Sequence, residues 1–221
     1  MSKPKILVYG SGSGSGAEKL VESSRPGGVL DADIVGFVCN RKSAGIHERA
    51  QRLGIPMIYH PTSRWDSGLY QQVAKESGAD FFAFSGWLLP AYGLDPQTAF
   101  NSQTVFNIHP GDLPEYGGVG MYGHHVHEKV IHDYKEGKIT RSALCMHFVT
   151  PVYDQGPVFC RRYVDIIDGD NAVTLGARVN IGEHRWQARI TSMVVHREIY
   201  WDGINHRTLH VPPGYSIDAD A

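Results

Sequence analysis

Two polar side chains close together in the sequence could hold an oxygen and move a proton. Asn107 and His109 flank an isoleucine at the end of the apolar run over 104–108 (TVFNI), which predicts a strand. Side chains alternate along a strand, so this amide and this imidazole point to the same face. Imidazole can hold or pass a proton near neutral pH, and an amide can donate to a polar oxygen. A buried polar pair that only closes the strand is the alternative.

A carboxylate later in the chain could act on that imidazole. Asp154 begins the segment 154–157 (DQGP), in which glycine and proline shape a turn between two expected strands. Only the fold can bring Asp154 to His109, but there the carboxylate would orient the imidazole and stabilise its protonated form. A turn aspartate without a chemical role is the alternative.

A glycine-rich segment over 10–16 (GSGSGSG) follows the first apolar run. Glycines allow a tight turn, and the free N–H groups of a following helix favour an anion, so we expect a phosphate site. Gly12-x-Gly14-x-x-Ala17 also fits a loose dinucleotide pattern. The second apolar run, however, ends near Arg41 rather than in the acid that would hold a ribose. A flexible turn and a non-catalytic nucleotide-binding module stay open.

A histidine-rich segment, GHHVHE, contains His124, His127 and Glu128. Helical spacing puts His124 on one face with each of the other two, which could suggest a metal site. The sequence lacks a His-Glu-x-x-His motif and a supporting set of cysteines or carboxylates. We therefore expect a solvated helix face or a structural role, and no metal.

Strands and helices that must position these residues alternate in the first half of the chain. Expected strands cover 5–9, 34–39, 56–59, 81–85 and 104–108, and expected helices cover 17–24, 44–53 and 69–77. This order predicts an α/β fold with a mainly parallel twisted sheet and a Rossmann-like N-terminal half.

The second half changes in character. An apolar helix face recurs from Tyr122 to Tyr134, and strands over 143–149 and 158–166 precede a long helix over 172–193. A small hairpin is expected over 197–211, and the tail over 212–221 is expected to be loose.

Composition excludes several classes of protein. The 221 residues are 42% hydrophobic and 20% charged, with a formal net charge of −2. These values fit one globular domain and disfavour disorder, a coiled coil and a nucleic-acid or membrane partner. Three widely spaced cysteines make neither a disulfide framework nor a zinc knuckle. The N-terminal residues lack a signal-peptide pattern, and we expect a cytoplasmic protein.

Taken together, these motifs resemble the folate-dependent formyltransferase family, from Ile6 to about Trp186. The resemblance rests on 106–110 (FNIHP) with Leu113-Pro114 behind it, and on 145–149 (CMHFV) leading to 154–157. It implies a single formyltransferase domain that transfers the formyl group of 10-formyltetrahydrofolate to an amine, by direct attack through a tetrahedral intermediate. In that reaction Asn107 and His109 would hold the oxygen, while Asp154 would keep His109 charged and help to relay the proton.

The resemblance also implies an acceptor and the residues that bind both ligands. The acceptor is glycinamide ribonucleotide, of de novo purine synthesis. Implied substrate-binding residues are Gly12, Ser13, Gly14, Ser15, Gly16, Pro110 and Glu183. Implied folate-binding residues are Trp87, Leu88, Leu89, His147, Val149 and Thr150. The chain would divide into a phosphate-binding half (1–110), a folate and catalytic half (111–196) and a C-terminal hairpin and tail (197–221), with a homodimer as a possible assembly.

Departures from the family pattern leave related activities open. Gly16 stands where the family often has asparagine, and the segment after the fourth expected strand, 86–90 (GWLLP), lacks the usual arginine. A sugar-nucleotide N-formyltransferase is the first alternative. Methionyl-transfer-RNA formyltransferase and formyltetrahydrofolate deformylase fit less well, because proteins of those kinds carry extra domains.

Overall fold

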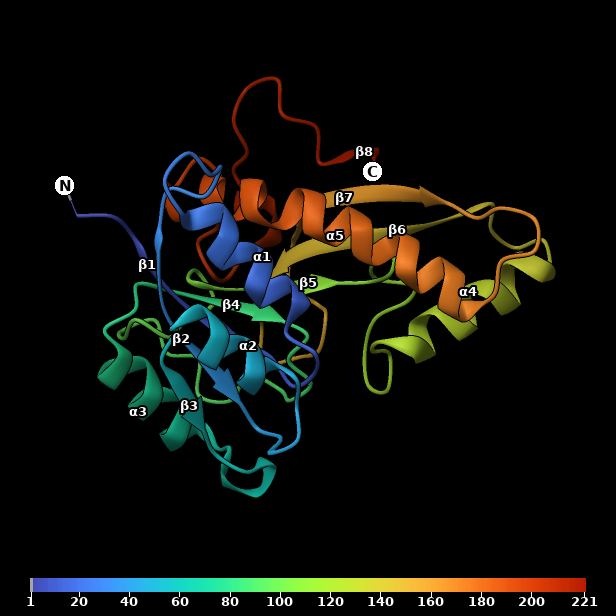
Figure 1. Ribbon diagram of the computed structural model, residues 1–221. Helices are drawn as coiled ribbons and strands as arrows, with labels where there is room; N and C mark the ends of the chain where they lie inside the picture. Colours follow the sequence, from blue (N-terminus) through green and yellow to red (C-terminus); the bar gives the residue numbers. More distant parts are fainter. Residues whose placement is uncertain (1) are drawn as a thin grey trace.

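One eight-stranded sheet runs through the molecule in a computed structural model that describes residues 2–221 (Figure 1). The strand order is β3-β2-β1-β4-β5-β6-β7-β8. The strands are β1 (Lys5–Tyr9), β2 (Asp33–Cys39), β3 (Met57–Tyr59), β4 (Phe81–Ser85), β5 (Val105–His109), β6 (Arg141–Phe148), β7 (Val158–Asp165) and β8 (Asp218–Asp220). Neighbouring strands are parallel from β3 to β5, antiparallel through β6 to β7, and parallel again between β7 and β8.

Helices cover both faces of this sheet. They are α1 (Ser15–Ser24), α2 (Ile46–Leu53), α3 (Ser67–Ser77), α4 (His124–Lys135) and α5 (Ala172–Val195). Figure 1 shows α5 running beside α1 and α4, while α3 lies apart from them. Within residues 2–221, the helices are too short or too polar to cross a membrane.

The core has two parts because β1 is buried on both faces. Ile6 and Val8 pack with residues of α1, α2, α4 and α5 in one cluster. Leu7 and Tyr9 point the other way and pack with α3 in a second cluster. Strands covered on both faces read as continuous apolar runs, which is why the first half of the sheet is visible in the sequence. The expected single-domain α/β fold with a mainly parallel sheet is confirmed, and each expected strand and helix lies within a few residues of an observed one.

The C-terminal segment differs from its expectation. The expectation of a loose tail was wrong, because the strand β8 pairs with β7 and the Tyr215 hydroxyl donates to the carbonyl of Phe159 at 2.8 Å. The hairpin expected over 197–211 reduces to one antiparallel bridge between Tyr200 and His210, with a turn of 3-10 helix, η2 (His206–Thr208), between them.

The three cysteines are all buried as free thiols. Cys39 ends β2, Cys145 lies in β6 and Cys160 lies in β7. Burial raises the pKa of each of the three thiols above its ordinary value. A thiol with a raised pKa is a poor nucleophile, so these cysteines act as small apolar core residues.

Candidate active site

A cavity of about 630 Å³ lies at the carboxyl ends of β1, β4 and β5. One wall consists of the segments that follow these strands, over 11–16, 85–88 and 107–110. The opposite wall is formed by the loop 118–123, by Asp154 and by α5. Open α/β sheets place their ligands at this edge, so the cavity is the candidate active site.

The glycine-rich segment forms one end of the cavity, as expected for an anion site. The helix α1 begins at Ser15 directly after Gly14, whose φ is 76° and which has no side chain to cap the helix, while the Ser15 N–H donates to Ser13 Oγ at 3.4 Å. A Cβ on Gly14 would lie 2.7 Å from the Ile46 side chain, so glycine is required there. Arg49 Nε donates to the Ser13 carbonyl at 2.8 Å and fixes the loop. The N-terminus of α1 and the cavity-lining Arg41 make this end electropositive.

The three side chains expected to do the chemistry meet at the floor of the cavity. Asp154 Oδ2 lies 3.9 Å from His109 Nδ1, and Asp154 Oδ1 lies 3.4 Å from His147 Nε2. Asn107 pairs with His147 across β5 and β6, and Asn107 Nδ2 lies 3.1 Å from His147 Nε2. His147 Nδ1 donates to the Phe148 carbonyl at 2.8 Å, which fixes the ring. The cluster therefore has a fourth member, His147, that contacts both Asn107 and Asp154.

The contacts of His109 fix the position of its proton. His109 Nε2 lies 2.7 Å from the carbonyl oxygen of Tyr116, which can only accept, so Nε2 carries the hydrogen. Nδ1 is left facing Asp154. The ring is only 4% exposed, and burial lowers the pKa of His109 more than the Asp154 charge raises it. In the absence of ligands His109 is thus a neutral base, which differs from the expectation that Asp154 keeps it charged.

Asp154 is held ionised in an unusual backbone conformation. Its φ is 53°, and the Gly118 N–H donates to Oδ2 at 2.9 Å. Burial by itself would raise the pKa of Asp154. The His147 contact, the positive charges that His109 and His147 carry when they are protonated, and the Gly118 hydrogen bond outweigh that effect and lower it. A Cβ on Gly156 would clash with the Phe148 carbonyl, so the turn that presents Asp154 requires glycine there.

Glu183 lies on the α5 wall of the same cavity, as the resemblance implied. Asn180 Nδ2 donates to Glu183 Oε2 at 3.0 Å, one turn earlier in the helix. Burial raises the pKa of Glu183 to about 7. A half-buried carboxyl with one remaining free oxygen can accept from a ligand hydroxyl. Sequence reasoning missed Asn180, whose helical spacing to Glu183 was the available signal.

The residues implied for folate binding lie in two places. Leu88 lines the main cavity, whereas Leu89, His147, Val149 and Thr150 line a neighbouring cavity of about 40 Å³ that Asn107 also borders. Trp87 is only 7% exposed, and its indole Nε1 donates to the Tyr70 hydroxyl at 2.8 Å. Trp87 is thus mostly packed in the core, but it also lines both cavities, and a folate-binding role for this set stays a prediction.

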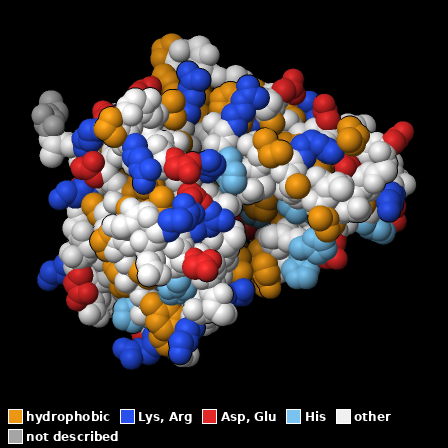
Figure 2. All heavy atoms as spheres, viewed as in Figure 1, with side chains coloured by type: hydrophobic (Ala, Val, Ile, Leu, Met, Phe, Trp, Pro, Cys, Tyr) orange, Lys and Arg blue, Asp and Glu red, His pale blue; other side chains and the backbone are white. Residues whose placement is uncertain are grey.

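The histidines of α4 do not converge on a common point. His124 lies 3.4 Å from Glu128, while His127 is buried and its pKa is lowered by burial to about 4. Figure 2 shows exposed histidine side chains on this helix. Over residues 2–221, the one group close enough to share an ion is His132, Asp133 and Glu136, where Lys129 and Lys138 also pair with Asp133. Two ammonium groups beside that carboxylate disfavour a cation.

The chain is similar to known proteins in both sequence and fold. A sequence model of the family described as formyl transferase matches residues 4–191. The chain is 31% identical over 210 residues to a phosphoribosylglycinamide formyltransferase, chloroplastic, from Arabidopsis thaliana, covering 91% of this chain and 70% of that protein. It is 25% identical to a phosphoribosylglycinamide formyltransferase from Bacillus subtilis, covering 92% and 97%. The fold matches a crystal structure of phosphoribosylglycinamide formyltransferase from Anaplasma phagocytophilum with a TM-score of 0.81, 22% identity and 99% coverage of both chains.

Proposed function

Because the chain belongs to the formyl transferase family, we propose that it is a phosphoribosylglycinamide formyltransferase. The reaction is transfer of the formyl group of 10-formyltetrahydrofolate to the amine of glycinamide ribonucleotide, in purine biosynthesis. The observation that carries this proposal is one continuous cavity. It has an anion-binding helix N-terminus at one end, a carboxyl group on α5, and an amide–imidazole–carboxylate cluster on its floor.

The acceptor fits this cavity by its chemistry. A phosphate matches the N-terminus of α1 with the loop 12–16, and ribose hydroxyls match Glu183. The amine then points toward Asn107 and His109. Proximity of two bound reactants contributes several kcal/mol to such a reaction, about 7–11 in the best oriented cases.

The protonation states suggest how the cluster acts. The acceptor amine attacks the formyl carbon directly, and Asn107 Nδ2 donates to the oxygen on which negative charge develops; a donor of this kind contributes about 3 kcal/mol. His109 Nδ1 takes the proton that the amine loses. Asp154, 3.9 Å from Nδ1, stabilises the resulting imidazolium. The same proton moves to the folate nitrogen N10 as the tetrahedral intermediate collapses and the carbon–N10 bond breaks. These steps need neither a covalent enzyme intermediate nor a metal.

The pterin of the folate is proposed to lie against Trp87, Leu88, Leu89 and the backbone over 149–154, beside Asn107. A cytoplasmic location and a homodimer remain predictions of the sequence.

The test is formyl transfer by the purified protein with glycinamide ribonucleotide and 10-formyltetrahydrofolate, followed by the absorbance of the folate product. We expect rapid turnover that Asn107→Ala removes. Folate binding without turnover on this acceptor would contradict the proposed acceptor, and aminosugar nucleotides, which need the same catalytic cluster, are then the substrates to assay.

A further inference from the structure

The C-terminal strand β8 joins the edge of the sheet beside β7, and Arg161 of β7 links it to the segment that follows His109. The pairing register aligns four residues in one row across the sheet, His109 in β5, Cys145 in β6, Arg161 in β7 and Asp218 in β8. Residues paired in this way project to the same face of a sheet. A side chain of β8 can therefore influence the region next to His109 through Arg161.

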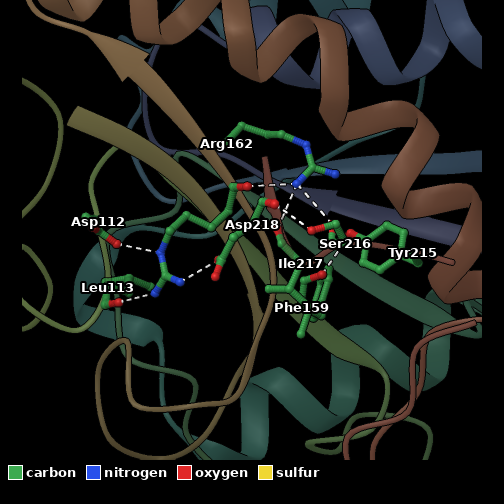
Figure 3. Close-up of polar contacts among 9 residues, drawn as sticks. Asp112, Leu113, Phe159, Arg162, Tyr215, Ser216, Ile217 and Asp218 are labelled. Atoms are coloured by element: carbon green, nitrogen blue, oxygen red, sulfur yellow. Dashed lines mark hydrogen bonds and ion pairs between the residues drawn. The ribbon is translucent and has the colours of Figure 1, made fainter. Parts of the chain in front are cut away.

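Arg161 connects β8 to that region with all three guanidinium nitrogens. Nε donates to Asp112 Oδ1 at 2.6 Å, Nη2 donates to the Leu113 carbonyl at 2.7 Å, and Nη1 donates to Asp218 Oδ1 at 2.7 Å. Asp112, Leu113 and Asp218, the three partners of this guanidinium, are labelled in Figure 3. The planar guanidinium is held in one orientation, because each of its three nitrogens donates to a partner.

A second arginine of β7 holds the segment before β8 in place. The neighbouring Arg162 points to the other face, is 3% exposed, and donates to the Ile217 carbonyl at 2.8 Å. Its guanidinium also lies 4.5 Å from the ring centre of Trp186 on α5. Figure 3 shows Arg162 beside Ser216 and Tyr215. Asp218 is thus presented to Arg161 by an ordered segment.

The segment that Arg161 holds is the one that orients His109. The Tyr116 N–H donates to the Asp112 carbonyl at 2.8 Å, which closes a turn over 112–116. That turn aims the Tyr116 carbonyl at His109 Nε2, 2.7 Å away. This contact keeps the hydrogen on Nε2 and leaves Nδ1 free to accept a proton.

We propose that Asp218 is a positioning residue for His109. Its carboxylate holds the guanidinium of Arg161, and Arg161 in turn holds Asp112 and Leu113 in place. The turn over 112–116 then directs the Tyr116 carbonyl to His109 Nε2, which sets the tautomer of His109. The kinetic consequence rests on the proposed function, whereas the effect on the tautomer does not depend on the substrate.

Asp218→Asn tests this inference, and Asp220→Asn is the matched control. Asp220 lies on the same strand and its carboxylate is 3.3 Å from Arg141, away from the held segment. We expect Asp218→Asn to lower kcat about tenfold with little change in either KM, because a small misplacement of a catalytic group is costly. Asp220→Asn should match the unchanged enzyme. Arg161→Lys, which keeps the charge but loses the fork, should lower kcat further.

Nitrogen NMR of the His109 ring supplies the second readout. We expect one tautomer, with the hydrogen on Nε2, in the unchanged protein and after Asp220→Asn, and a mixture of tautomers after Asp218→Asn. Equal kcat and equal His109 spectra in the two variants would overturn the inference. If the unchanged protein fails to formylate glycinamide ribonucleotide but Asp218→Asn still alters the His109 spectrum, the proposed function fails and the positioning role stands.

Discussion

At the residue scale, the role proposed for Asp154 depends on its negative charge, and one substitution can remove that charge while keeping the shape of the side chain. Asparagine tolerates the left-handed backbone that Asp154 adopts, so Asp154→Asn keeps the turn and removes the negative charge. We expect kcat to fall by about a hundredfold or more, because the imidazolium of His109 loses its partner. Stopped-flow or steady-state assays measure kcat, and calorimetry measures binding of each substrate, which should change little.

Asp168→Asn is the control for this prediction. Asp168 is an exposed carboxylate in the loop after β7, outside the cavity. Normal turnover after Asp154→Asn, or an equal loss after both substitutions, would contradict the role of the Asp154 charge.

Glu183 makes the stability of the folded protein depend on pH. Burial raises the pKa of its carboxyl from 4.5 to about 7, so the folded protein holds this proton more tightly than the unfolded chain. The stabilising effect of the protonated form is therefore complete at acid pH and is lost as pH rises toward 7. We expect the free energy of unfolding, measured by urea denaturation, to fall with rising pH over this window relative to Glu183→Gln.

Acceptor binding should show the opposite trend with pH. In the proposed acceptor complex a ribose hydroxyl donates to the ionised form of Glu183, so the KM for glycinamide ribonucleotide should rise as pH falls below about 7. Glu183→Gln should raise the KM and remove this dependence. The same pH dependence of the KM in both proteins would argue against the contact.

At the residue scale the sequence pointed to the side chains proposed for catalysis, but not to the contacts that set their protonation. Asn107, His109 and Asp154 were recognisable by type and motif. The position of the His109 proton depends on the Tyr116 carbonyl, a backbone group that leaves no trace in the sequence. Likewise, His147 was expected to contact folate. Its bonds to Asn107 and Asp154 follow from the β5–β6 register, which local pattern does not specify.

At the scale of the elements, the backbone of the loop before α1 requires glycine at position 14 but not at position 12. Gly14 has a positive φ and its Cβ would meet Ile46, whereas a Cβ on Gly12 would meet nothing within 4 Å. We expect Gly14→Ala to lower the free energy of unfolding by about 1–3 kcal/mol, and Gly12→Ala to change it little. Thermal or urea unfolding of the two variants measures the difference. Equal losses would mean that the backbone of the loop is not the constraint.

The elements with strong local signals were predictable, and the C-terminal element was not. Strands such as β1 and β4 are buried on both faces and show as apolar runs. By contrast β8 is Asp-Ala-Asp, a sequence with low strand propensity. Its order comes from tertiary partners, including Arg161 and the backbone of β7, so the sequence around it reads as a loose tail.

At the scale of the whole molecule, the sheet joins the two halves of the chain into one unit. The strand β5 pairs with β4 on one side and with β6 on the other, and α5 packs against both α1 and α4. We expect a single thermal transition in which the calorimetric and van't Hoff enthalpies agree. Two resolved transitions would mean that the halves before and after residue 110 unfold separately.

The alkylation rates of the three buried thiols can measure how often the structure around each of them opens. An alkylating reagent modifies a cysteine only when the surrounding structure opens, so the rate at each site measures how often that region opens. Cys39, Cys145 and Cys160 lie in three different strands and need no engineering. Mass spectrometry of partly alkylated protein would thus give the order in which β2, β6 and β7 become accessible. Modification of Cys160 ahead of Cys145 would show the sheet fraying from the edge that β8 covers.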